Sequence, residues 1–170
     1  MIRKDRDSEP KARILSIIKG TTVDGPGLRT SIYFSGCRHH CPECHNPQSW
    51  DFETGELMTL SDLMAVVAEE DFDVTLSGGD PLYQPEFVAA LTVAVRKAGH
   101  STWIYTGFTL EEILADEKLI CAVRDAEAIV EGRYDDSLRS PDLPFRGSSN
   151  QRIIYVTEDT FKNRGDCPGP

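Results

Sequence analysis

Residues 74–81 read Val74-Thr75-Leu76-Ser77-Gly78-Gly79-Asp80-Pro81. The apolar, β-branched first half predicts a strand, and the diglycine followed by proline predicts a turn that enters a helix. Apolar residues at helical spacing follow at Phe87, Val88, Leu91 and Val95. Gly99 is a suitable stop for that helix. A buried strand that turns into a helix is the unit of a parallel sheet, so this stretch predicts an α/β fold.

The same alternation of strand and helix extends over most of the chain. Short β-rich runs are predicted at residues 13–18, 31–35, 73–77, 102–105, 126–131 and 152–156. Further helices are predicted behind two capping boxes, Thr59 with Asp62 and Thr109 with Glu112. The 170 residues are too few for a closed eight-fold βα barrel, which typically needs about 250. We therefore expect a partial, open (βα)-type barrel of about six mainly parallel strands.

Size and composition indicate one globular domain. We expect it to span residues 13–161, between a flexible N-terminal tail at 1–12 and a C-terminal tail at 162–170. The formal net charge of -10 disfavours non-specific binding to nucleic acid and to anionic membranes. No segment approaches the roughly 18 apolar residues of a membrane span, and no export signal is recognisable. A cytoplasmic location is therefore predicted, where thiols stay reduced.

Three cysteines lie within eight residues, in the run Gly36-Cys37-Arg38-His39-His40-Cys41-Pro42-Glu43-Cys44-His45. In a reducing compartment such a group indicates metal or redox chemistry rather than a disulfide framework. Haem attachment at Cys41-x-x-Cys44-His45 needs export, and a dithiol pair of Cys41 and Cys44 leaves Cys37 unexplained. A zinc ion closed by one of the histidines would be a structural staple. A four-iron cluster on three thiolates would leave one iron open to an amino group and a carboxylate, which S-adenosylmethionine offers.

The C-x3-C-x2-C spacing resembles the hallmark of the radical S-adenosylmethionine superfamily. The flanking residues are similar to those of activating proteins of glycyl-radical enzymes: Val23-Asp24-Gly25-Pro26-Gly27-Leu28-Arg29-Thr30 before the cysteines, and His45-Asn46-Pro47 with Trp50 after them. One position departs, because many members place an aromatic residue where Glu43 stands. The resemblance implies a [4Fe-4S] cluster on Cys37, Cys41 and Cys44. It also implies S-adenosylmethionine bound beside Glu43, Cys44 and His45.

Gly78, Gly79 and Asp80 have two interpretations. As ordinary local structure, Asp80 caps a helix that begins at Pro81. As a ligand site, the diglycine allows the backbone to approach a cofactor closely because no Cβ intervenes. The resemblance implies the second, since a Gly-Gly-Glu-like motif binds the methionine amino group in the superfamily. Later strands end at the same edge in Tyr105-Thr106-Gly107 and Glu131-Gly132-Arg133-Tyr134. None of these side chains is predicted to act as a catalytic acid or base.

The stretch Phe145-Arg146-Gly147-Ser148-Ser149-Asn150-Gln151-Arg152 is similar to a signature of the activators of anaerobic ribonucleoside-triphosphate reductase. The resemblance implies an oxidoreductase that cleaves S-adenosylmethionine reductively and generates a glycyl radical on that reductase, with a flavodoxin-like reductant. Activation of another glycyl-radical enzyme, of the pyruvate formate-lyase type, stays open, as does a zinc-stapled binding module without a reaction. Cys121 is expected to be a buried apolar residue and Cys167 an exposed, free thiol.

Overall fold

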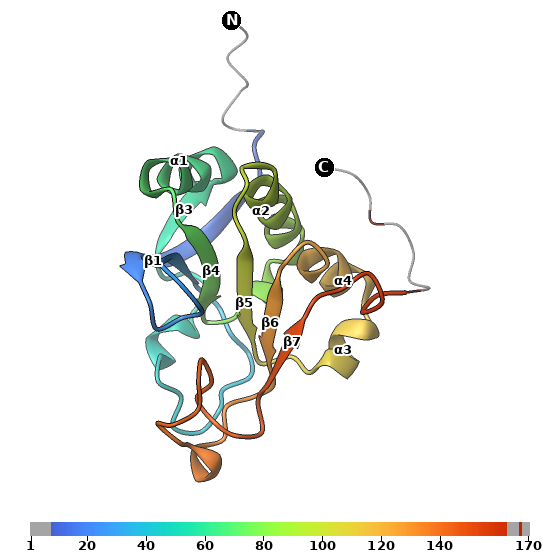
Figure 1. The fold of residues 1–170 in the computed structure, drawn as a ribbon. Coiled ribbons are helices and arrows are strands. Elements are labelled where there is room, and N and C mark those ends of the chain that lie inside the picture. The colour runs from blue at the N-terminus through green and yellow to red at the C-terminus, as the bar shows by residue number, and fades with distance from the viewer. Residues whose placement is uncertain (1–7, 163–166, 168–170) are drawn as a thin grey trace, which may run out of the picture.

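The computed structural model describes residues 8–162 and 167, and its central feature is one seven-stranded sheet (Figure 1). The strands are β1 (Lys11–Thr21), β2 (Arg29–Phe34), β3 (Glu56–Thr59), β4 (Asp73–Gly78), β5 (Thr102–Thr106), β6 (Ala128–Glu131) and β7 (Arg152–Tyr155). Their order across the sheet is β3-β1-β2-β4-β5-β6-β7. Neighbours from β2 to β6 are parallel, whereas β1 is antiparallel to β2 and β3, and β7 is antiparallel to β6. The expected α/β class with an open sheet is confirmed.

The finer prediction of about six mainly parallel strands is not confirmed, because the sheet has seven strands and three of its neighbouring pairs are antiparallel. The missed strand, β3, has four residues and lies at the edge of the sheet, so its sequence pattern is weak. Residues 22–28 join β1 to β2, and a parallel pair would need a crossover of about a dozen residues or more. Residues 132–151 join β6 to β7 and contain a short 3-10 helix, Asp136–Leu138, in place of the α-helix of a βαβ unit.

The α-helices in the described residues bury their apolar side chains against one face of the sheet. They are α1 (Leu60–Glu70), α2 (Pro85–Lys97), α3 (Leu110–Leu114) and α4 (Glu117–Val123). Strand residues such as Leu76 and Ile104 are fully buried in this main core, together with helical residues such as Leu91. Successive strand residues point to opposite faces, so Trp103 and Val130 form a separate small cluster on the other face. In the part of the chain that the structure describes, the apolar residues of the α-helices pack on the first face, and the second face leaves room for a site.

Local sequence signals at the helix ends are confirmed. Thr59 and Asp62 form the predicted capping box of α1, and Thr109 and Glu112 form that of α3. Gly99 follows the end of α2 with a φ of 92°, a backbone conformation that favours glycine. These caps fix where each helix starts after its strand, and so they fix where the strand-end loops lie.

The structure corrects the expectation for the last two cysteines. Cys121, on α4, is not a lone apolar residue, and Cys167 is not a free thiol. The two form a disulfide with Cα atoms 5.5 Å apart, although 46 positions separate them in the chain. No spacing rule predicts that Cys167 lies beside Cys121.

The predicted domain limits stay a prediction. β1 already begins at Lys11, two residues before the expected start at 13. Residues 1–7, 163–166 and 168–170 of the two predicted tails lie outside the described residues. Within the part of the chain that the structure describes, no helix has the length and apolar character needed to cross a membrane.

Candidate metal and cofactor site

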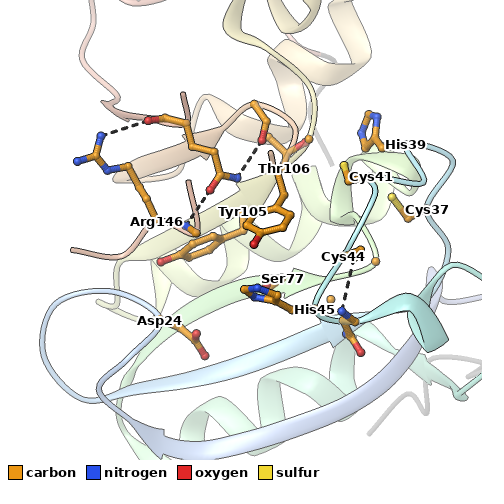
Figure 2. A pocket seen from close by; sticks show the side chains of 18 of the residues that line it. Asp24, Cys37, His39, Cys41, Cys44, His45, Ser77, Tyr105, Thr106 and Arg146 are labelled. Atoms are coloured by element: carbon orange, nitrogen blue, oxygen red, sulfur yellow. Dashed lines mark hydrogen bonds between the residues drawn. The ribbon is translucent and has the colours of Figure 1, made fainter. Parts of the chain in front are cut away.

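A cavity of about 540 Å³ lies at the carboxyl ends of the central strands (Figure 2). Its wall includes Gly78 at the end of β4, Thr106 at the end of β5 and Gly132 directly after β6. In open α/β sheets ligands bind at this edge. The predicted site residues Cys37, Cys41, Cys44, His45, Gly78 and Gly79 all line the cavity.

Cys37, Cys41 and Cys44 are free thiols on one loop that follows β2. The loop is fixed by backbone bonds to residues after the third cysteine: Gly36 N donates to Ser49 O at 2.7 Å, and Cys37 N donates to Trp50 O at 3.2 Å. A further turn closes between the last two cysteines, where Cys44 N donates to Cys41 O at 3.1 Å. The three sulfur-bearing side chains therefore enter the cavity from a preformed loop.

Burial disfavours the charged form of the Cys37 and Cys41 thiols before any metal binds. It raises the pKa of the Cys37 thiol to about 11 and also raises the pKa of Cys41. A thiol must lose its proton to bind iron, so binding of a metal by this loop releases protons. Asn46 N donates a hydrogen bond to Cys44 Sγ at 3.5 Å.

No three His, Cys, Asp or Glu side chains in residues 8–162 and 167 are arranged to hold a single metal ion. Three free thiols that line one cavity are the donor set of an iron–sulfur cluster, which takes a cysteine thiolate at each of several corners. The residues present thus fit an iron–sulfur cluster.

The diglycine is required by the packing of the cysteine loop. A Cβ on Gly79 would lie 2.6 Å from Gly36 O and 2.7 Å from Ser49 O, closer than any real Cβ contact. Gly78 has a φ of 108°, and a Cβ there would lie 2.3 Å from Phe34 N. Strand β4 can therefore approach the loop only because both side chains are absent. The same absence exposes the backbone of both residues to the cavity.

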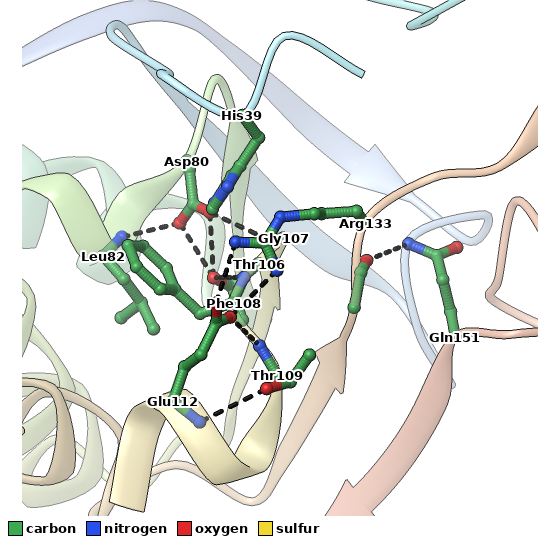
Figure 3. Close-up of polar contacts among 11 residues, drawn as sticks. His39, Asp80, Leu82, Thr106, Gly107, Phe108, Thr109, Glu112, Arg133 and Gln151 are labelled. Atoms are coloured by element: carbon green, nitrogen blue, oxygen red, sulfur yellow. Dashed lines mark hydrogen bonds and ion pairs between the residues drawn. The ribbon is translucent and has the colours of Figure 1, made fainter. Parts of the chain in front are cut away.

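Asp80 is fully buried and does not line the cavity, although its predicted partners Gly78 and Gly79 do. One carboxylate oxygen accepts a hydrogen bond from Leu82 N at 2.9 Å, as the helix-cap interpretation predicts. The other accepts from Gly107 N at 2.9 Å and lies 2.8 Å from His39 Nε2. Figure 3 shows this group with Thr106, whose hydroxyl also donates to the carboxylate. Asp80 thus joins the ends of β4 and β5 to the cysteine loop.

His39 is a buried side chain that helps to hold the cysteine loop. Its side chain is 5 % exposed and packs against Phe108 and Tyr83, with ring centroids 4.7 and 5.4 Å away. A Cβ on Gly107 would lie 2.4 Å from the His39 ring. Sequence reasoning considered His39 only as a zinc ligand. A histidine between two cluster cysteines carries no signal that would reveal an aspartate partner 41 positions away.

The predicted contacts Glu43 and His45 occupy different positions. Glu43 is exposed, has a φ of 56° and does not line the cavity. His45 lines the cavity and lies against Tyr134, with ring centroids 4.7 Å apart. Trp50, noted in the sequence only as a flanking residue, stacks on His40 at 4.5 Å.

The segment before β2 contributes a wall that sequence reasoning missed. Asp24 and Tyr33 line the cavity, and Tyr33 Oη donates to Asp24 Oδ2 at 2.7 Å. Arg29 is 1 % exposed and donates to Thr75 Oγ1 and Val74 O, both at 2.8 Å. A buried arginine with satisfied donors holds this segment under the cavity. The sequence signal that could have revealed this wall is Asp24, a charged residue between Val23 and the turn residues Gly25-Pro26-Gly27.

The cysteine-lined cavity and its diglycine define an iron–sulfur protein. A family model described as a 4Fe-4S single cluster domain matches residues 23–154, which covers most of the chain. The crystal structure of QueE from Escherichia coli is similar to 58% of this chain and 54% of that chain, with a TM-score of 0.50 and 20% identity. That similarity supports the fold alone.

Relatives with higher sequence identity define the family within the iron–sulfur proteins. Proteins named anaerobic ribonucleoside-triphosphate reductase-activating protein are 33% identical in Salmonella typhi, over 79% of this chain and 92% of the relative, and 33% identical in Escherichia coli strain K12, with the same coverage. The protein of that name in Enterobacteria phage T4 is 32% identical over 83% of this chain and 92% of the relative. The chain belongs to the family of anaerobic ribonucleoside-triphosphate reductase-activating proteins.

Proposed function

We propose that this protein cleaves S-adenosylmethionine reductively and generates a glycyl radical on an anaerobic ribonucleoside-triphosphate reductase. One observation carries the proposal: three free cysteines line the same cavity as an exposed diglycine backbone, in a chain of this family. When bound, a [4Fe-4S] cluster and S-adenosylmethionine supply the one-electron chemistry that yields methionine and a 5′-deoxyadenosyl radical.

The protein's own residues would bind, orient and shield these groups. We assign Cys37, Cys41 and Cys44 as the cluster ligands, and the backbone of Gly78 and Gly79 as the contact for the methionine end of the cofactor. His45 and Cys44 lie on the same wall and would adjoin the cofactor. Asp80 acts through His39, because its carboxylate is used inside the protein. No side chain is needed as an acid or base.

The proposal also covers the fold, the electron donor and the cellular location. The open sheet would be the partial barrel of the superfamily, formed by a single domain over residues 13–161. A low-potential carrier of the flavodoxin type would supply the electron, and the cytoplasm would keep the three cluster thiols reduced. Activation of another glycyl-radical enzyme is the second candidate, because the cavity residues do not themselves select the reductase.

Anaerobic reconstitution followed by product analysis tests the function. The reduced, reconstituted protein should convert S-adenosylmethionine to 5′-deoxyadenosine slowly without a partner. Addition of the reductase should give a glycyl-radical signal by electron paramagnetic resonance, with a yield that follows the deoxyadenosine formed. A radical on another glycyl-radical enzyme alone would change the partner and keep the chemistry. Absence of deoxyadenosine from protein with full iron and sulfide content would refute the chemistry.

A further inference from the structure

One part of the cavity wall holds buried polar groups that the protein leaves without partners. The Oη of Tyr105 and the Nε of Arg146 are both buried and have no hydrogen-bond partner among the described residues. Both side chains line the cavity, as does Asp24. Figure 2 shows Asp24 and Arg146 on the side away from the three cysteines, with Tyr105 between the two sides. Because a buried donor without an acceptor is unfavourable, such groups indicate a ligand that completes them.

Asp24 adds a fixed acceptor to this wall. Its Oδ2 accepts hydrogen bonds from Ser31 Oγ at 2.8 Å and from Tyr33 Oη at 2.7 Å. Its backbone is also held, since Thr75 Oγ1 donates to Asp24 O at 2.7 Å. A carboxylate can accept about four hydrogen bonds, so two of them leave capacity for a donor in the cavity. The side chain is oriented before any ligand arrives.

Tyr105 is a donor at every pH at which the protein would be assayed. Burial raises the pKa of its phenol, and the negative charge of Asp24 raises it further. The wall therefore presents a neutral O–H and a guanidinium N–H as donors, and a carboxylate as acceptor.

We propose that Asp24, Tyr105 and Arg146 bind the main chain of the partner polypeptide at the segment that contains the reacting glycine. This inference rests on the proposed function. A peptide group offers one N–H donor and one C=O acceptor. Its N–H can donate to Asp24, and its C=O can accept from Tyr105 or Arg146. Val23, which is 72% exposed, and Leu143 also line the cavity and provide apolar contacts for the flanking side chains.

The nucleoside of S-adenosylmethionine is the other source of matching donors and acceptors. A different pair of rings, His45 and Tyr134, is placed for it. His45 directly follows Cys44, and the backbone of Tyr134 interacts with the Cys41 thiol. This pair therefore adjoins the cluster loop, where the cofactor must bind, and leaves the Asp24 side of the cavity to the polypeptide.

The substitution Tyr105→Phe separates a binding role from a structural one. It removes an O–H that makes no hydrogen bond within residues 8–162 and 167, so the thermal midpoint of the free protein should not fall. Affinity for a synthetic peptide that carries the glycine segment of the reductase should fall about fivefold, as expected for one neutral hydrogen bond. The peptide is titrated into reconstituted protein saturated with S-adenosylmethionine. Tyr155→Phe, at a 60% exposed residue outside the cavity, is the matched control.

The outcomes distinguish this subsite from the proposed function. A loss of peptide affinity that exceeds any loss of S-adenosylmethionine affinity supports the subsite. A loss confined to S-adenosylmethionine assigns Tyr105 to the nucleoside and overturns it, and equal peptide affinity for Tyr105→Phe and unmodified protein overturns it as well. If the unmodified protein neither binds the peptide nor forms a radical on the reductase, the proposed function and the subsite both fail.

Discussion

Replacing Asp80 by asparagine changes one oxygen of a fully buried carboxylate into an NH2 group. Oδ1 accepts from the Leu82 amide, and Oδ2 accepts from the Gly107 amide and lies beside His39 Nε2. An asparagine side chain has a single acceptor oxygen. Whichever way it is oriented, its NH2 group faces one of the two backbone N–H groups, and that N–H loses its acceptor. Thr106 can adapt, because its hydroxyl can accept as well as donate.

The expected cost follows from that one orphaned donor. A buried N–H without a partner costs about 1–3 kcal/mol. In a domain of this size each kcal/mol lowers the unfolding midpoint by roughly 2–4 °C, so a decrease of about 2–12 °C is expected. The decrease should lie toward the upper end of this range if His39 also loses its contact with residue 80, since the cysteine loop then loses one of its buried side-chain contacts.

Thermal unfolding of the metal-free protein, followed by circular dichroism, measures this cost. The matched control is Asp116→Asn, at the exposed N-cap of α4, where the carboxylate accepts from Lys118 N at 2.8 Å. Asparagine caps helices about as well as aspartate, so the control should shift the midpoint little. If both variants unfold at the same temperature, the buried carboxylate does not require both of its oxygens as acceptors, and the proposed link between β4, β5 and the cysteine loop is wrong.

Three further predictions concern the metal site. Gly79→Ala should lower the iron content after reconstitution as well as S-adenosylmethionine binding, because the new Cβ would meet Gly36 O at 2.6 Å; full iron content measured by colorimetric assay would contradict this. Cys37→Ala should abolish iron–sulfur absorbance whereas Cys121→Ala, which only opens the disulfide, should retain it, and the opposite result would reassign the ligands. In metal-free protein the Cys37 thiol, with a pKa of about 11 instead of 9.0, should carry roughly 100-fold less thiolate at neutral pH. Its alkylation by iodoacetamide, measured by mass spectrometry, should accelerate with pH up to about 11, and a plateau near pH 9 would show that burial does not control it.

Local signals in the sequence were sufficient for the helix starts and for the residues that meet at the strand ends. Capping boxes depend on residues three positions apart, so Thr59 with Asp62 could be recognised without a fold. The common edge for the cysteines and the diglycine also followed, because parallel strands bring their carboxyl ends together. Strand direction at the sheet edges did not follow from periodicity, although the short connection at 22–28 already excluded a parallel crossover.

The sequence alone could not predict which distant residues contact one another in the folded protein. The role of Asp80 depends on His39 and Gly107, which are 41 and 27 positions away and meet it only after three segments have packed. The unsatisfied Oη of Tyr105 could not be predicted from the sequence either, since a strand tyrosine most often forms hydrogen bonds with other protein groups or with water. A single chain gives residue types and spacings, and these do not report which buried polar groups stay unsatisfied.

The disulfide between Cys121 and Cys167 can be intact or reduced, so the protein exists as two covalent species that depend on the conditions of its preparation. With 46 positions between the cysteines, loop-closure entropy alone assigns the bond a stabilisation of about 4 kcal/mol. Cluster reconstitution is carried out with thiol reductants, which open accessible disulfides by exchange. Protein purified in air and protein loaded with iron would then differ in chain topology as well as in metal content. Stabilities measured on the two preparations are comparable only after the state of this bond has been determined in each.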